Sequence, residues 1–234
     1  MDIHVLTLFP NMFDPVLSES IVKRGRDSGR LRIGIHDIRK YSLDRHRKVD
    51  DKPFGGGPGM VLQCQPVLDA LQSVRRACPN AKVMLMGPKG RVLDQGLCNS
   101  LAQQRSLVLI CGHYEGVDER IRGFISDEIS IGDYVLTGGE LAAMVLIDAV
   151  ARLVPGVLGD LNSNADESFI GGLLEYPHYT RPADYKGRKV PAVLLSGNHR
   201  AVERWREVES IRETIDKRPD MIRHIKQLEI GKGV

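Results

Sequence analysis

The chain has 234 residues, of which 42% are hydrophobic and 27% are charged, and its formal net charge is +3. These values are ordinary for a globular protein that forms one substantial core and has room for a smaller second domain. No segment is long and apolar enough to cross a membrane, and residues 1–9 lack the basic start and cleavage site of a signal peptide. We therefore expect a cytoplasmic protein whose first residues form a core strand.

Basic side chains are concentrated in two zones. Residues 23–48 contain ten Lys or Arg against three Asp, and residues 176–234 contain thirteen Lys or Arg against eight Asp or Glu. Two such zones suggest two contacts with a polyanion, although a basic stretch taken alone is more commonly a solvated surface.

The four cysteines do not form a recognisable metal or disulfide pattern. Cys64, Cys78, Cys98 and Cys111 show neither C-x-x-C spacing nor paired histidines. We expect them to be reduced and mostly buried, and we expect no metal site.

Strand-like and helix-like segments alternate through the first 155 residues. A strand at residues 83–86, a helix at 95–104 and a strand at 107–111 are one example. This alternation predicts an α/β fold with a mainly parallel sheet and helices on both faces.

Three predicted strands each end in glycine. Residues 83–86 run into Gly87, residues 107–111 into Gly112, and residues 131–136 lead to Gly138 and Gly139. Ligands collect at the carboxyl ends of parallel strands, so three glycine-ended strands together predict one shared pocket. A single glycine after a strand is more commonly an ordinary turn. No G-x-G-x-x-G or P-loop motif is present, which disfavours the common nucleotide-binding folds.

The remaining segments complete a two-domain organisation. The mostly apolar residues 140–154 indicate a buried helix that carries Asp148 and Arg152. Residues 160–175 are rich in Asn, Asp, Ser and Gly, which is typical of a linker. Asn198 is the predicted N-cap of a helix of about fifteen residues, and a last helix is expected around residues 221–228. The predicted domains are residues 1–159 and 176–234, joined by a flexible linker at 160–175.

Four motifs carry a resemblance to a known family. Residues 51–60 (DKPFGGGPGM), 112–120 (GHYEGVDER), 131–140 (IGDYVLTGGE) and 177–182 (PHYTRP) resemble those of the bacterial tRNA (guanine-N1)-methyltransferases, and the similarity extends from Leu8 to Trp205. The resemblance implies the trefoil-knotted SPOUT fold, with a C-terminal knot before a small helical, RNA-binding domain. It also implies a homodimer whose pocket is shared between subunits, and methyl transfer to guanine 37 of tRNA.

The methyl donor implied by the resemblance is S-adenosyl-L-methionine (SAM). Adenine is expected among backbone groups of the glycine-ended loops, and Glu115 near the positive end of the donor. The expected donor-binding residues are Pro88, Gly112, Glu115, Ile131, Gly132, Asp133, Tyr134, Val135, Leu136, Gly138 and Gly139. A requirement for Mg²⁺ is left open.

Methylation of guanine N1 needs a base that removes the N1 proton, and a carboxylate is the expected group. The adjacent Asp166 and Glu167 are candidates from the residues alone, although solvated loop acids often look the same. In the family the catalytic aspartate directly precedes Ser-Phe, and here Glu167 holds that position. We therefore favour Glu167 and keep Asp166 as the alternative. Arg152 is expected to stabilise negative charge on guanine O6.

The RNA contacts are predicted from the region before and within the glycine-rich motif. Its composition is too rich in glycine for a core and too poor in lysine for a P-loop, which favours a flexible flap against the target nucleotide. The expected RNA-binding residues are His46, Lys48, Gly55, Gly56, Gly57 and Ser168.

Three other functions remain open at this point. A related knotted enzyme acting on ribosomal RNA would share the donor pocket, and a non-catalytic RNA-binding protein would need none. A small-molecule hydrolase using His113 and Asp118 lacks a nucleophile elbow or metal spacing.

Overall fold

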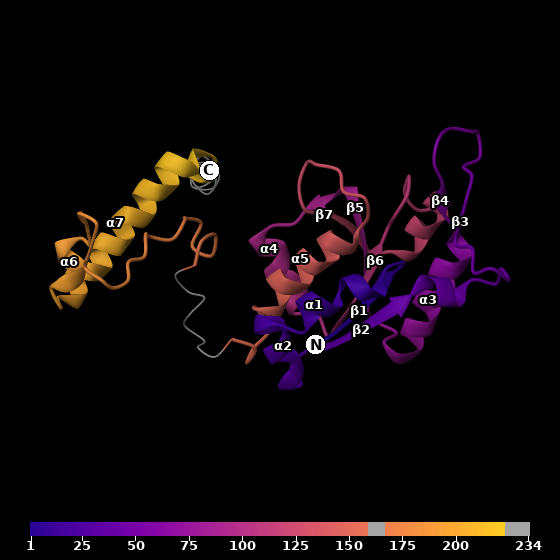
Figure 1. Ribbon diagram of the computed structural model, residues 1–234, viewed down its shortest axis with the longest axis horizontal. Coiled ribbons are helices and arrows are strands. Elements are labelled where there is room, and N and C mark those ends of the chain that lie inside the picture. Colours follow the sequence, from indigo (N-terminus) through magenta and orange to yellow (C-terminus); the bar gives the residue numbers. More distant parts are fainter. Residues whose placement is uncertain (159–166, 223–234) are drawn as a thin grey trace, which may run out of the picture. The chain divides into compact units, whose positions relative to one another are not determined.

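The computed structural model describes residues 1–158 and 167–222 and divides into two compact units, Met1–Gly159 and Asp160–Val234. Figure 1 shows both units with their elements labelled. The first unit contains β1 (Asp2–Thr7), η1 (Pro10–Met12), α1 (Asp14–Leu17), α2 (Ser20–Asp27), β2 (Arg32–Asp37), η2 (Ile38–Tyr41), β3 (Asp50–Asp51), β4 (Val61–Leu62), α3 (Cys64–Ala77), β5 (Lys82–Val92), α4 (Gln95–Ala102), β6 (Ser106–Cys111), η3 (Glu119–Phe124), β7 (Asp127–Ser130) and α5 (Glu140–Ala151).

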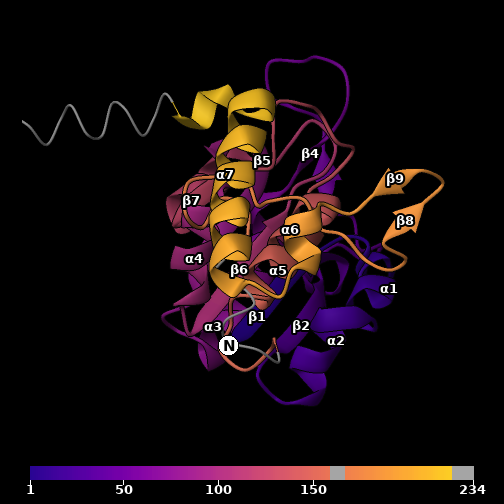
Figure 2. The same ribbon diagram turned by 90° about the vertical axis from the view of Figure 1, so that its left-hand side faces the viewer.

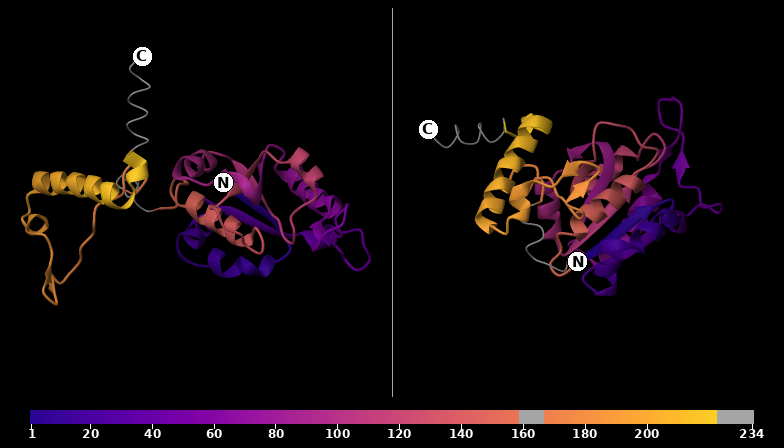
Figure 3. Two further views of the ribbon diagram at one scale, coloured as in Figure 1. Left: turned by 90° about the horizontal axis from the view of Figure 1, so that it is seen from above. Right: turned by 60° about the vertical axis from the view of Figure 1, so that its left-hand side comes forward.

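The main sheet of the first unit is parallel, with strand order β2-β1-β6-β5-β7. Two apolar clusters lie on its two faces. One includes residues of α1, α2, α4 and α5, and the other includes residues of α3, η2 and η3. Views from two further directions show the arrangement of these layers (Figure 3). The predicted α/β class with a mainly parallel sheet is thus confirmed.

The strand β6 shows why this sheet forms. Its residues Leu107, Leu109 and Cys111 belong to one apolar cluster, and Val108 and Ile110 belong to the other. A strand covered on both faces is expected to be a continuous apolar run rather than an alternating one, and the run at 107–111 has that pattern.

Two predicted strand ends are wrong in detail. Strand β5 does not stop before Gly87 but continues to Val92, with a shift of register between Met86 and Arg91 in its pairing with β7. The predicted strand at 131–136 is a loop, because β7 ends at Ser130. The Ser130 hydroxyl both donates to the Gly132 carbonyl (3.0 Å) and accepts from the Gly132 N–H (3.2 Å), which turns the chain at that point.

The helix α5 is buried over most of its surface, as predicted, but it ends at Ala151 with Arg152 as its C-cap. Leu141 and Val145 are each about half exposed, at 49% and 47%. Residues four apart share a helix face, so α5 presents an uncovered apolar strip in this unit.

Within the second unit the structure describes β8 (Asp184–Tyr185), β9 (Arg188–Lys189), α6 (Ala192–Leu195) and α7 (His199–Lys217). Figure 2 shows α7 as the long helix of this unit. The predicted N-cap is confirmed, because the Asn198 side chain accepts a hydrogen bond from the Ala201 N–H at 3.1 Å. The helix is longer than expected, and the last predicted helix lies mostly outside the described residues.

The part of the predicted linker that the structure describes is held to α7. The N–H of Leu174 donates to the Thr214 hydroxyl at 2.8 Å, and the N–H of Glu175 donates to the Ser168 hydroxyl at 3.1 Å. Thr214 is the one buried residue among residues 167–222. Over residues 1–158 and 167–222, no helix combines the length and hydrophobicity that a membrane span needs.

Candidate active site

A cavity of about 310 Å³ lies in the first unit at the carboxyl ends of β6 and β7, beside the register shift in the middle of β5. This volume is at the lower end of the range typical of small-molecule sites. Ten of the eleven expected donor-binding residues line it, and Asp133 is the exception. The ten are Pro88, Gly112, Glu115, Ile131, Gly132, Tyr134, Val135, Leu136, Gly138 and Gly139.

The wall of the cavity is built by backbone groups packed directly against one another. The Gly139 N–H donates to the Gly112 carbonyl at 2.8 Å, and His113 and Gly138 form an isolated antiparallel bridge. A Cβ atom at Gly139 would lie 2.9 Å from Cα of Cys111 and 3.1 Å from N of Gly112. Only glycine fits this close approach of two loops.

A buried carboxylate lies beside this wall. Glu140, the first residue of α5, is only 2% exposed, and the Thr7 hydroxyl donates to its Oε1 at 2.8 Å. Its Oε2 lies 4.0 Å from Nδ1 of His113, whose ring packs against Phe9 at a centroid distance of 4.9 Å. Glu140 thus links the end of β1 to the loops that form the wall, and its place at the start of α5 suits a negative charge.

A charged group that no sequence motif indicated also lines the cavity. Arg122 of η3 forms an ion pair with Glu119 at 2.9 Å and another with Glu128 of β7. The hydrogen bond to Glu128 is the main cause that raises the pKa of Arg122. Gly87 makes room for this pair, because a Cβ atom there would lie 2.4 Å from Oε1 of Glu128. The glycine at 87 was the only sequence signal of this contact.

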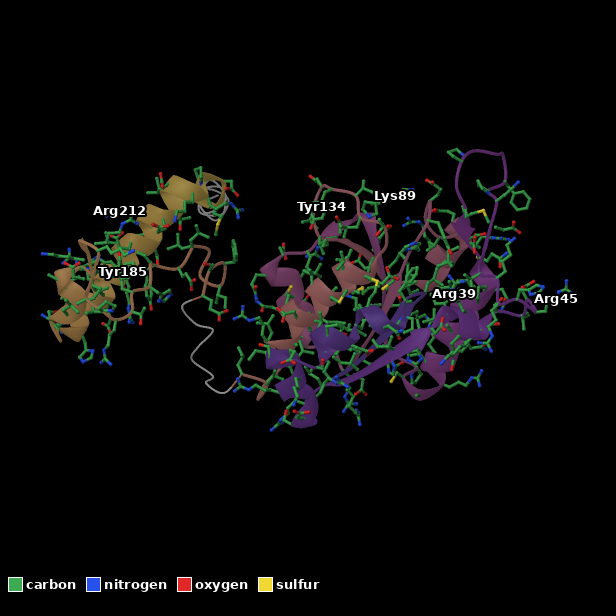
Figure 4. All side chains as sticks on the ribbon, viewed as in Figure 1. Arg39, Arg45, Lys89, Tyr134, Tyr185 and Arg212 are labelled. Carbon is green, nitrogen blue, oxygen red and sulfur yellow. The ribbon has the colours of Figure 1, made fainter. Side chains whose placement is uncertain are left out.

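Lys89 of β5 and Tyr134 of the loop after β7 also line the cavity, and Figure 4 labels both. Tyr134 is 55% exposed and its hydroxyl donates to the Ile131 carbonyl at 3.3 Å. An aromatic ring and a cation therefore stand at the open side of the cavity.

The flap, defined as residues 52–60, connects β3 and β4 and extends away from the body of the first unit (Figure 1). Its glycines 55, 56, 57 and 59 all have positive φ, and Phe54 is fully exposed. At its base the Glu115 N–H donates to the Met60 carbonyl at 3.0 Å. The base of the flap therefore contacts a residue of the cavity wall.

His46 and Lys48 lie in the exposed loop ahead of the flap. Their backbone N–H groups donate to Oδ1 of Asp44 at 2.7 and 3.3 Å, and these two bonds lower the pKa of that carboxyl. The loop leaves the His46 and Lys48 side chains exposed, and Arg45 projects from the same loop in Figure 4.

The predicted catalytic residues are distributed over both units. Arg152 follows α5 in the first unit, and Glu167 belongs to the second, next to Ser168, which was predicted to contact RNA. Asp166 lies outside the described residues.

The cavity fits the parts of SAM by its chemistry. Apolar side chains of Pro88, Ile131 and Leu136 suit an adenine ring, and the strand ends offer backbone donors and acceptors to its edge. The carboxylate of Glu115 suits a sulfonium cation, whereas those of Glu119 and Glu128 are already paired with Arg122.

Comparison with known proteins gives one consistent family. The family model described as "tRNA (Guanine-1)-methyltransferase TrmD" matches residues 1–224. A tRNA (guanine-N(1)-)-methyltransferase from Ruminiclostridium cellulolyticum is 56% identical over 223 residues, which cover 94% of this chain and 96% of the relative. One from Limosilactobacillus fermentum is 54% identical over 230 residues, covering 97% and 91%. The crystal structure of tRNA (m1G37) methyltransferase from Aquifex aeolicus has a TM-score of 0.79, 39% identity and coverage of 96% and 95%.

Proposed function

Because the chain belongs to the tRNA (guanine-1)-methyltransferase family, we propose that it methylates N1 of guanine 37, beside the anticodon of tRNA, with SAM as the methyl donor. The observation that carries the proposal is the cavity beside the register shift of β5 and the carboxyl ends of β6 and β7, whose wall includes Glu115 at the base of the flap. The proposed donor site and the flap, which is expected to contact RNA, thus meet at Glu115. A tRNA substrate places the reaction in the cytoplasm.

The donor-side residues have distinct tasks in this proposal. SAM supplies an electrophilic methyl group on a sulfonium. The backbone of residues 131–139 and the loop after β6 hold the adenine, and the close Gly112–Gly139 contact keeps their separation constant. A wall of this kind orients the methyl group without having to reorganise during the reaction.

The acceptor side needs a base and a counter-charge. Guanine N1 carries a proton in the neutral base, so a carboxylate must take it as the methyl group arrives. We assign this role to Glu167, with Asp166 as the alternative. Arg152 stabilises the negative charge that develops on O6.

The flap and its neighbouring loop serve the RNA. The target guanine must leave its stack to reach the cavity, which an anticodon loop allows more readily than a duplex. His46 and Lys48 contact phosphates, glycines 55–57 let the flap follow the RNA, and Ser168 contacts the target beside Glu167.

We place the complete site in a homodimer, in which the Glu167 segment of one subunit serves the donor cavity of the other. The half-exposed Leu141 and Val145 on α5, together with Val135 at 89% exposure in the cavity wall, are apolar groups that a second subunit would cover.

The first experiment measures transfer of labelled methyl groups from SAM to two tRNA transcripts that differ only in guanine or adenine at position 37. We expect methylation of the guanine transcript alone. Glu167→Gln should lower kcat by about 10²- to 10⁴-fold, which is the usual contribution of general base catalysis. Donor affinity should stay unchanged, because Glu167 is not among the residues that line the cavity.

Asp166→Asn is the matched variant, since it removes the neighbouring carboxylate and keeps the Glu167 one. We expect it to retain activity close to wild type. If Asp166→Asn lost activity and Glu167→Gln kept it, Asp166 would be the general base instead of Glu167. Methylation of both transcripts would contradict the assigned substrate.

The second experiment mixes two inactive variants, Glu167→Gln and Gly139→Ala, under conditions that allow subunits to exchange. If the site is shared, each mixed dimer contains one intact site out of two. Random exchange of equal amounts makes about half of the dimers mixed, so activity should return to about a quarter of wild type. Absence of recovery, with exchange shown by mass spectrometry, would mean that each subunit completes its own site.

A further inference from the structure

A second group of reactive side chains lies apart from the donor cavity, on the α3 side of the sheet. His4 is on β1, His36 is on β2, and Cys78 is the residue after α3. The Cys78 Sγ lies 3.6 Å from Nε2 of His4, and Nδ1 of His4 lies 3.0 Å from Nε2 of His36. The three side chains therefore form a continuous hydrogen-bonded series with His4 in the middle.

The strand register explains why the two imidazoles meet. His4 is paired with Gly34, and His36 is two residues further along β2 on the same face. A Cβ atom at Gly34 would lie 3.0 Å from Nδ1 of His4 and 3.2 Å from Nε2 of His36. The absence of a side chain at residue 34 creates the space in which the two rings approach each other.

The environment keeps the two imidazoles uncharged. Burial lowers the pKa of His4, against a smaller opposite effect of Asp2, and burial together with the charge of His4 lowers the pKa of His36. At neutral pH both rings are therefore mostly uncharged, and a neutral imidazole that contacts a thiol can take its proton.

A fixed cation lies near the same thiol. Arg32 donates two hydrogen bonds to Asp2, at 2.6 and 3.0 Å. The Asp2 hydrogen bond is the main cause that raises the pKa of Arg32, and the charge of Cys78 adds a smaller effect. Arg32 is thereby held as a cation on the same strand as His36.

The other three cysteines lack this arrangement. Cys98 and Cys111 are buried, and burial is the main cause that raises the pKa of both thiols. Cys64 is partly exposed like Cys78, but burial and its hydrogen bond to Asp118 raise its pKa, against a smaller opposite effect of Arg120. Cys64 is thus an internal control that has similar access and an acidic neighbour in place of a base.

We propose that Cys78 is a nucleophilic thiol and a site of mixed-disulfide formation with low-molecular-weight disulfides, with His4 as its base and His36 as the residue that orients His4. A nucleophile, a base and an orienting group within hydrogen-bond reach are the usual signature of an activated nucleophile.

The proposed step is a thiol–disulfide exchange. The Cys78 thiol gives its proton to Nε2 of His4, and the thiolate attacks one sulfur of the disulfide RS–SR. The bond between the two R-bearing sulfurs breaks as the bond from Cys78 forms, and the departing RS⁻ takes the proton back from His4. The Cys78 sulfur is oxidised, one sulfur of the reagent is reduced, and the products are the mixed disulfide and RSH.

The test reacts the full-length protein with 5,5′-dithiobis(2-nitrobenzoate) at pH 7, follows the released thiolate by absorbance, and assigns the modified cysteine by peptide mass mapping. Cys78 should react first, about tenfold faster than Cys64, because His4 can accept the Cys78 proton during the attack whereas Cys64 contacts a carboxylate. Cys78→Ser should remove this fast phase. Glutathione disulfide should show the same preference.

Three variants separate the relay from simple access. His4→Gln should slow Cys78 about tenfold, and His36→Gln and Gly34→Ala should slow it about threefold, while Cys64 keeps its rate. Circular dichroism checks that each variant is folded. If His4→Gln does not fold, the Cys78 rates in His36→Gln and Gly34→Ala test the proposal. Equal rates at Cys78 and Cys64, or an unchanged Cys78 rate in the folded variants, would overturn the proposal.

Discussion

Two glycine-rich segments of the first unit use glycine for opposite reasons. In the flap, no atom lies within 4 Å of a Cβ built at Gly55, Gly56 or Gly57, and all three have positive φ. In the cavity wall, Gly138 and Gly139 are surrounded, and a Cβ at Gly138 would lie 2.3 Å from Oε2 of Glu140. In the flap, glycine provides conformational freedom. In the cavity wall, the missing side chain lets two backbone segments pack closely against each other.

The difference teaches how this unit combines a rigid site with an adaptable one. The wall contacts β6 and the start of α5, so its shape is set by the core beneath it. The flap is attached by the short β3–β4 pair and by backbone hydrogen bonds to residues 115, 116 and 118. Donor binding should therefore be sensitive to wall substitutions, and flap substitutions should affect mainly the RNA.

The largest expected effect is that of Gly139→Ala. The added methyl group meets backbone atoms, which cannot move aside as a side-chain end can. We expect about 3 kcal/mol of destabilisation, the upper part of the usual range for overpacking. Donor affinity should fall by at least about 100-fold, because two loops that line the cavity are pushed apart. Thermal unfolding and calorimetry with SAM measure the two effects.

Gly123→Ala is the matched control for this substitution. Gly123 lies in η3 of the same unit, and no atom lies within 4 Å of a Cβ built there. It should bind SAM as wild type does, and equal losses in the two variants would show that the wall is not the sensitive element.

Gly56→Ala tests the other side of the comparison. Its φ of +81° strains an alanine, but nothing opposes the added methyl group. We expect a cost of at most about 1 kcal/mol, since the flap can relax. Donor affinity should stay unchanged, and the KM for tRNA should rise about threefold as the flap loses conformations. A loss of SAM affinity in this variant would contradict the division of roles.

The smallest effect concerns Asp118, where the base of the flap meets the loop after β6. Its N–H donates to the Leu62 carbonyl at 2.9 Å, and its carboxylate accepts from the Arg120 side chain. That side-chain bond is the main cause that holds the pKa of Asp118 far below its usual range. A carboxyl group with a lower pKa in the folded than in the unfolded chain stabilises the fold above the unfolded value, and this stabilisation is lost as the pH falls.

Asp118→Asn should therefore lower the free energy of unfolding by about 0.5 kcal/mol at pH 7, as expected for an ion pair whose arginine is mostly exposed. The difference from wild type should shrink as the pH falls below about 4, the usual pKa of an unfolded Asp. Denaturant unfolding at several pH values measures it, and Arg120→Gln should produce the same change. A difference that persists unchanged at low pH would assign the effect to packing.

The sequence by itself determined the parallel α/β class, several of the elements and the loops that form most of the cavity wall. The apolar run at 107–111 predicted β6, and Asn198 predicted the start of α7, because both signals come from neighbouring residues. Most wall residues could be predicted because they lie in two short motifs, at residues 112–120 and 131–140. Residues that are close together in the sequence are also close together in space. The family resemblance supplied their assignment to SAM, which residue patterns alone could not.

Only the tertiary structure decided which distant side chains meet. The Thr7–Glu140 hydrogen bond joins residues 133 positions apart, and the His4–Cys78 contact joins residues 74 positions apart. The loop at 131–136 was mistaken for a strand because its apolar residues have a strand-like pattern, whereas the turn depends on Gly132 and the Ser130 hydroxyl. Such contacts depend on strand register and helix packing, which no local pattern records.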